Sequence, residues 1–142
     1  MPPEQHGKLV YPTVEEITET NREAALEERN PHAVIQPANL RFAVDGLKDK
    51  YNDKPFEQAV ILKAAFLLDA LANKGHAFAD ANKRTALSTT LSFLQYNGFE
   101  MDTSNRPEII AFILPVARGE KSLTAIAKWI TKRVITFRDP IV

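Results

Sequence analysis

The sequence predicts an all-α protein that folds as one compact domain of about six helices. Apolar residues recur at helical spacing in successive stretches separated by Pro, Gly or Asn, and no stretch shows the alternation of a half-buried strand. The chain has 142 residues, of which 44% are hydrophobic and 25% charged, as in one soluble domain with a sizeable core. We therefore expect residues 1–142 to form a single domain, with tails at residues 1–10 and 136–142.

The first helix is expected from Thr13 to about Arg29. Thr13 lies three residues before Glu16, which is the spacing of a capping box, in which each residue's side chain bonds the other's backbone N–H. The polar composition of this segment predicts a helix at the surface. Residues 31–36 are expected to be irregular, and a shorter helix should follow over about residues 38–50.

The centre of the domain is predicted to be the helix that starts at Pro55 and runs to about Asn73, because it is apolar on nearly every side. A further strong helix should open at Asn82 and close at Asn97-Gly98, where Gly98 can adopt the left-handed conformation. Two amphipathic helices complete the pattern, at about residues 107–118 and 122–134. Their aromatic residues, Phe112 and Trp129, fall on apolar faces and are expected in the core.

Composition and charge exclude several classes of protein. The 18 basic and 18 acidic residues cancel, so the whole chain lacks the positive charge that direct binding to nucleic acid or an anionic membrane would require. No cysteine is present, which excludes disulfides and thiolate chemistry. No apolar run approaches the roughly 18 residues that span a bilayer, and the N-terminus lacks the apolar core of a signal peptide. We expect a cytoplasmic protein.

The segment His76–Arg84 carries most of the reactive groups, between two strongly helical stretches. A helix that begins near Ala81 or Asn82 leaves its first backbone N–H groups unpaired and has a partial positive charge there, so it favours phosphate oxygens. Lys83 and Arg84 lie in its first turn, where cations oppose the helix dipole. Their position indicates that an anion binds at this helix start.

Three other side chains of the segment have chemical roles to consider. Asp80 can cap the following helix, can bind a Mg²⁺ that keeps several waters, or can do both. His76 has the side chain whose unperturbed pKa allows it to accept a proton from a hydroxyl near neutral pH. Phe78 alternates with these groups and is expected to anchor the loop in the core. A purely structural alternative has Asp80 as the N-cap, but it leaves the cations of the first turn unexplained.

The segment His76-Ala77-Phe78-Ala79-Asp80-Ala81-Asn82-Lys83-Arg84-Thr85-Ala86-Leu87 resembles the signature of the Fic/Doc family, and specifically its Doc (death on curing) toxin branch. Further resemblance covers residues 11–17, 91–99 and 119–129. The likeness implies a Fic/Doc-type helical bundle with the active-site loop between two central helices. It also implies that part of a nucleotide, with ATP as co-substrate and Mg²⁺ as cofactor, is transferred to a hydroxyl of a target protein.

The resemblance implies a role for each residue of the loop. By position, His76 would be the general base and Asp80 the metal ligand. The anion hole would come from Asn82 and the backbone around it, including Ala81, and Lys83 and Arg84 would hold the phosphates during catalysis.

Departures from the broader family pattern narrow this expectation. Adenylylating members resemble one another in His-Pro-Phe, Gly-Asn-Gly-Arg and a second Arg three positions on, whereas this chain has Ala77, Ala81, Lys83 and Leu87 there. Lys83 and Leu87 favour the Doc branch, whose members resemble kinases that bind the nucleotide in the reversed sense. The likeness then implies transfer of a γ-phosphate to a Ser/Thr hydroxyl of a protein such as elongation factor Tu, which inhibits translation.

Two alternatives remain open at this point. One is a Fic-type protein adenylyltransferase, and the other is a non-catalytic helical domain that binds a partner and keeps a residual anion site. Self-inhibited Fic proteins resemble one another in a Glu followed by Gly or Asn, and this chain has no such pair. We therefore expect regulation in trans by an antitoxin segment that lies in a groove involving the first helix.

Overall fold

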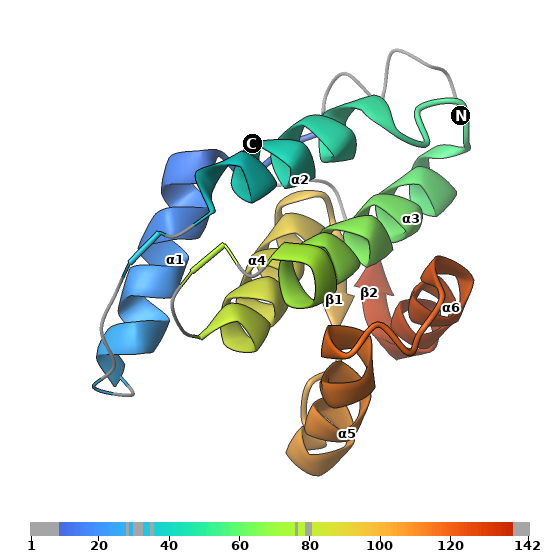
Figure 1. The fold of residues 1–142 in the computed structure, drawn as a ribbon. Helices are drawn as coiled ribbons and strands as arrows, with labels where there is room; N and C mark the ends of the chain where they lie inside the picture. Colours follow the sequence, from blue (N-terminus) through green and yellow to red (C-terminus); the bar gives the residue numbers. More distant parts are fainter. Residues whose placement is uncertain are drawn as a thin grey trace.

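The computed structural model describes residues 9–27, 29, 33–34, 36–75, 77–78 and 81–137. The described residues form six α-helices, one π-helical segment and two short strands, so the all-α prediction is confirmed (Figure 1). In chain order the elements are α1 (Val14–Glu27), α2 (Pro37–Asp49), α3 (Phe56–Asp69), η2 (Ala70–Gly75), α4 (Asn82–Tyr96), β1 (Phe99–Met101), α5 (Arg106–Ala117), α6 (Leu123–Arg133) and β2 (Val134–Phe137).

Helix α3 is the buried centre of the fold, as its uniform hydrophobicity predicted. It packs against α2, α4 and α6, and its residues Ala59, Val60, Ala64, Ala65 and Leu67 have no exposed surface. The chain leaves α3 directly into the π-helical η2, which packs against α2, α4 and α5. The helix predicted to end near residue 73 therefore extends to residue 75 in a wider turn, of a kind often found at functional sites.

The small antiparallel sheet was not predicted. Strands β1 and β2 pair Phe99 with Phe137 and Glu100 with Thr136, with an irregularity before the pairing of Met101 with Val134. The tail expected at residues 136–142 was therefore wrong for residues 136 and 137. Strands of three and four residues are too short to show alternation, and they are stabilised by partners far apart in the sequence.

Helix α1 begins with the predicted capping box. The Thr13 N–H donates to Glu16 Oε1 at 2.9 Å, and the Glu16 N–H donates to Thr13 Oγ1 at 3.1 Å. One face of the helix is buried, chiefly against α4, and the opposite face is exposed, as expected of a surface helix. The helix ends at Glu27, two residues before the predicted end.

The start of the described chain is fixed to the end of α4 by Asn97. Its Oδ1 accepts the Val10 N–H at 2.8 Å, and its Nδ2 donates to the Val10 carbonyl at 2.9 Å. Leu9 is buried, so the expected tail at residues 1–10 was wrong for residues 9 and 10, while residues 1–8 lie outside the described part. Gly98 follows with a φ of 95°, the left-handed helix end that the sequence predicted.

No helix within the described residues is both long and apolar enough to cross a bilayer.

Lys63 is fully buried in α3, which is unusual for a lysine. Its ammonium donates to the Leu47 carbonyl in the last turn of α2 at 2.5 Å and lies 5.2 Å from the ring centre of Tyr11. A cation is favourable at a helix C-terminus. Burial nevertheless lowers the pKa of Lys63 from its ordinary 10.5 to about 8, with Asp49 opposing the shift.

This pKa predicts that the protein becomes more stable as the pH rises above neutrality. Between about pH 8 and 10.5 the unfolded chain holds more protons at Lys63 than the folded chain, so the free energy of unfolding increases with pH. We expect a gain of about 2 kcal/mol between pH 7 and 9.5, measured by urea unfolding. The range stops below the titration of Tyr11, whose pKa is raised by burial.

Lys63→Met keeps most of the side-chain volume and removes the titrating group. Its unfolding free energy should lack this increase, and an equal increase in both proteins would show that another group is responsible.

Candidate functional site

The loop singled out in the sequence lies between η2 and α4, as expected. Its described residues are Ala77, Phe78 and Ala81, followed by the first turn of α4. His76 and Asp80 lie outside the described residues, so their roles as base and metal ligand stay predictions.

A reciprocal pair of hydrogen bonds connects the loop to the start of α4. The Phe78 N–H donates to Asn82 Oδ1 at 3.2 Å, and Asn82 Nδ2 donates to the Phe78 carbonyl at 3.0 Å. The Phe78 side chain is 3% exposed and belongs to the hydrophobic core, as an anchor of the loop requires. The Asn82 side chain is engaged in this way through Oδ1 and one Nδ2–H, so a contact from Asn82 to an anion would use its backbone N–H or the second Nδ2–H.

The loop is also held on its other side by the segment before α2. Val34 forms an isolated antiparallel bridge with Phe78, and the Gln36 N–H donates to the Ala77 carbonyl at 3.0 Å. The irregular segment predicted at residues 31–36 therefore contributes backbone hydrogen bonds to the site.

The residue before α4, Ala81, has a conformation that the sequence did not predict. Ala81 is the N-cap residue and has a left-handed backbone, with φ 62° and ψ 26°. The methyl side chain of Ala81 cannot accept a hydrogen bond, so the N-cap residue gives the helix no side-chain cap. Asp80 lies outside the described residues, so the structural alternative in which it caps the helix stays a prediction. A left-handed alanine costs roughly 1–2 kcal/mol, and such strain is typical of functional sites.

Polar contacts from the core hold this strained turn in place. Thr85 Oγ1 donates to the Ala81 carbonyl at 2.7 Å, and the Thr85 N–H donates to the same oxygen at 2.9 Å. From α1, Asn21 Nδ2 donates to Thr85 Oγ1 at 3.1 Å, and both side chains are 1% exposed. The start of α4 is thus fixed through buried hydrogen bonds to α1.

The two cations of the first turn have different surroundings. Arg84 forms an ion pair with Glu27 at the end of α1, and both side chains are largely exposed. An exposed pair of this kind contributes at most about 1 kcal/mol, so a phosphate could replace the carboxylate. Lys83 is exposed and makes no ion pair with a carboxylate in the part of the chain that is described.

A groove of about 690 Å³ opens between α4 and α5 and includes both cations in its lining. Its apolar lining consists of Leu87, Leu91, Ile109, Ile110, Ile113 and Leu114. Its polar lining consists of Lys83, Arg84, Arg106, Ser88, Thr103 and Ser104. The groove therefore combines positive charge with an apolar wall and has a volume typical of small-molecule sites.

A model of the Fic/DOC family matches residues 4–94, which include α1 to α3 and most of α4. The chain belongs to the Fic/DOC family. It is also similar to "Protein kinase doc" of Escherichia phage P1, with 44% identity over 95 residues. That match covers 67% of this chain and 65% of the relative, slightly less than two thirds of its length. The expected family and Doc branch are confirmed.

Sequence reasoning missed two residues near the start of α4 or in the groove beside it. Asn21 could have been noticed, because it is a polar residue on the apolar face of α1. Arg106 gave no signal, since its presence in the groove depends on how α5 packs beside α4.

Charged groups within the described residues form no cluster of three or more that could hold a metal ion. The predicted Mg²⁺ site would therefore depend on Asp80 together with phosphate oxygens and water. One protein carboxylate is enough for such an ion.

Replacing Asn82 by alanine should loosen the loop. The change removes both hydrogen bonds to Phe78, so we expect the free energy of unfolding to fall by about 1–3 kcal/mol. The Phe78 amide hydrogen should also exchange faster with solvent, as measured by NMR.

Asn52→Ala is a suitable control, because Asn52 donates to the Lys48 carbonyl at 2.9 Å, far from the loop in sequence and outside its hydrogen-bond network. It should leave exchange at Phe78 unchanged. Unchanged exchange in Asn82→Ala as well would mean that other contacts hold the loop.

Proposed function

We propose that this chain is a Doc-like toxin that transfers the γ-phosphate of a nucleoside triphosphate to a Ser/Thr hydroxyl of a target protein. The observation that carries the proposal is the braced start of α4, where Lys83 and Arg84 line a groove that continues past Leu87. The similarity to a relative named as a protein kinase points to the same reaction.

The residues at positions 83 and 87 favour phosphoryl over adenylyl transfer. Lys83 places a bulky cation at the position where adenylylating members of the family commonly have a glycine. Leu87 adds to the apolar wall of the groove instead of offering a second Arg to phosphates. A terminal phosphate at the start of α4 would leave the remainder of the nucleotide in this groove.

The proposed reaction is an in-line displacement. His76 accepts the proton of the target hydroxyl, whose oxygen attacks the γ-phosphorus, and the bond to the oxygen bridging the β- and γ-phosphates breaks to release the nucleoside diphosphate. Lys83, Arg84 and the first N–H groups of α4 would stabilise the charge on the transferred group. When bound at Asp80, Mg²⁺ would neutralise phosphate charge.

The partners follow from the same proposal. The target would be of the elongation factor Tu type, so that phosphorylation inhibits translation in the cytoplasm. An antitoxin segment would neutralise the toxin by binding as a helix in a groove. A cavity of about 400 Å³ between α1 and α4, lined in part by Tyr11, Ile17 and Tyr96, supports the expectation that α1 takes part.

Labelled ATP separates phosphoryl transfer from the alternatives. The purified chain is incubated with a bacterial extract and ATP carrying the label on either the α- or the γ-phosphate. Protein labelled from the γ-phosphate alone would support the kinase. Label from the α-phosphate would instead support adenylyl transfer, and no label from either would support a binding domain.

His76→Ala should abolish γ-phosphate transfer while leaving the fold and nucleotide affinity nearly unchanged. Loss of a general base lowers the rate by about 10²–10⁴-fold, which a quantitative transfer assay can measure. Asp80→Ala should lower both transfer and Mg²⁺-dependent nucleotide binding. If Asp80→Ala lowered only the melting temperature, the metal assignment would be wrong.

A further inference from the structure

The groove between α4 and α5 has an uneven distribution of charge. Its cations come from the first turns of the two helices: Lys83 and Arg84 from α4, and Arg106 from α5. Later turns of both helices contribute apolar side chains, including Leu91 and Ile110. No carboxylate is among its described lining residues, whereas the cavity between α1 and α4 includes a glutamate.

Arg106 is available to a ligand. It is exposed, and within the described residues it makes no ion pair with a carboxylate. The nearest acidic residue in α5, Glu108, is engaged elsewhere, because its carboxylate pairs with Arg133 of α6 and accepts from Asn105 Nδ2 at 3.1 Å. The positive charge of Arg106 is therefore not neutralised by its own helix.

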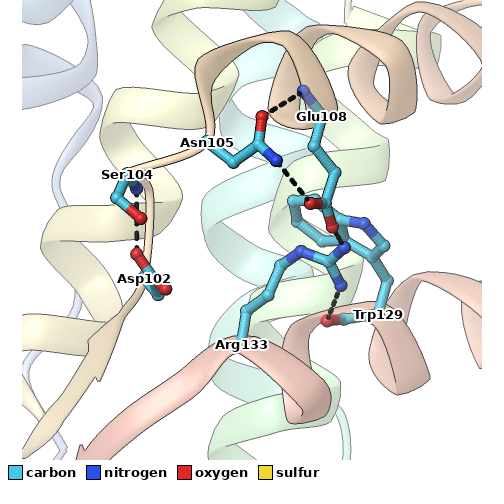
Figure 2. A network of polar contacts seen from close by, with 6 residues as sticks. All are labelled: Asp102, Ser104, Asn105, Glu108, Trp129 and Arg133. Atoms are coloured by element: carbon cyan, nitrogen blue, oxygen red, sulfur yellow. Dashed lines mark hydrogen bonds and ion pairs between the residues drawn. The ribbon is translucent and has the colours of Figure 1, made fainter.

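The segment that carries Arg106 is fixed by the network in Figure 2. The Asn105 side chain caps α5 by accepting the Glu108 N–H at 3.2 Å, and Asp102 accepts the Ser104 N–H at 2.9 Å. Arg133 joins this network to α6, since it pairs with Glu108 and donates to the Trp129 carbonyl at 3.2 Å. The start of α5 is thus held in position before any ligand binds, which lowers the entropic cost of binding.

The apolar part of the groove is exposed to solvent, so a ligand that covered it would bury apolar surface. Ile110 is 54% exposed and Leu114 is 41% exposed, although both lie on the wall of the same groove. A ligand with a negative end and a flat, weakly polar end would match both parts. A nucleoside triphosphate has this distribution of charge.

From this we infer that the groove between α4 and α5 binds the nucleoside of the triphosphate, and that Arg106 contacts the phosphates as a third cation. The inference rests on the proposed function and adds a residue beyond residues 4–94, which the family model matches. With the terminal phosphate at Lys83, the chain of phosphates passes Arg106 and the nucleoside lies against Leu91 and Ile110.

The lining also predicts weak selection between bases. Reading a base requires amide, carboxylate or guanidinium groups placed against its edge. Of the described lining residues beyond the three cations, only Ser88, Thr103 and Ser104 are polar. An apolar site discriminates between similar ligands by about 10–200-fold at most. We expect the imido analogues of ATP and GTP to bind within about 10-fold of each other.

Calorimetric titration of the full chain, with Mg²⁺, tests the inference with two probes: the non-hydrolysable imido analogue of ATP, and inorganic triphosphate, which lacks the nucleoside. Arg106→Ala should weaken both probes by about 10-fold, because a charge-assisted contact to phosphate is lost, and Arg106→Lys should recover part of the affinity. Ile110→Ala should weaken only the ATP analogue, by about 5-fold.

Arg118→Ala is the matched control. Arg118 is the same residue type at the other end of α5, where it pairs with Glu120, and it does not line the groove. Its affinities should equal those of the wild type.

Three outcomes would overturn the inference. Unchanged affinities in both Arg106→Ala and Ile110→Ala, with γ-phosphate transfer intact in the wild type, would refute it and leave the proposed function standing. Equal binding of triphosphate and the ATP analogue to the wild type would place the nucleoside outside the groove. A wild type that binds neither probe and transfers no phosphate would refute the proposed function as well.

Discussion

The pairing of the Asn82 side chain with the backbone of Phe78 is the interaction on which the site depends. It joins Phe78 to the first turn of α4 by satisfying one donor and one acceptor of the loop backbone. Phe78 also anchors the loop in the hydrophobic core, because its ring is buried there. The left-handed turn at Ala81 can then persist, since it is held on both sides.

The same device occurs at the other end of α4. Asn97 pairs with the backbone of Val10 through its side-chain oxygen and nitrogen, as Asn82 does with Phe78. An asparagine therefore binds a backbone segment outside the helix at each end of α4. Asn97 is fully buried, and a buried polar group is favourable only when it is fully paired. The bonds of Asn82 connect the loop to α4, and the hydrogen bond from Asn21 to Thr85 connects α1 to the same helix.

The electrostatics of the site follow from helix starts and not from net charge. Lys83 and Arg106 place positive charge at the starts of two helices. The negative charge of Glu108 is neutralised by its ion pair with Arg133 of α6. Helix α5 is further joined to α6 by Phe112 and Trp129, whose rings stack 4.1 Å apart at 3°. A neutral chain thereby presents a locally positive groove.

The sequence by itself determined the six helices, the buried α3, the capping box of α1 and the family, because helical periodicity, caps and a contiguous motif are all local features. The predicted roles of the motif residues remain predictions. Only the tertiary structure decided the pairing of β1 with β2, the hydrogen bond from Asn21 to Thr85 and the presence of both Lys83 and Arg106 in the lining of one groove. These depend on residues far apart in the chain, whose contacts arise from packing and leave no periodic signal in the sequence.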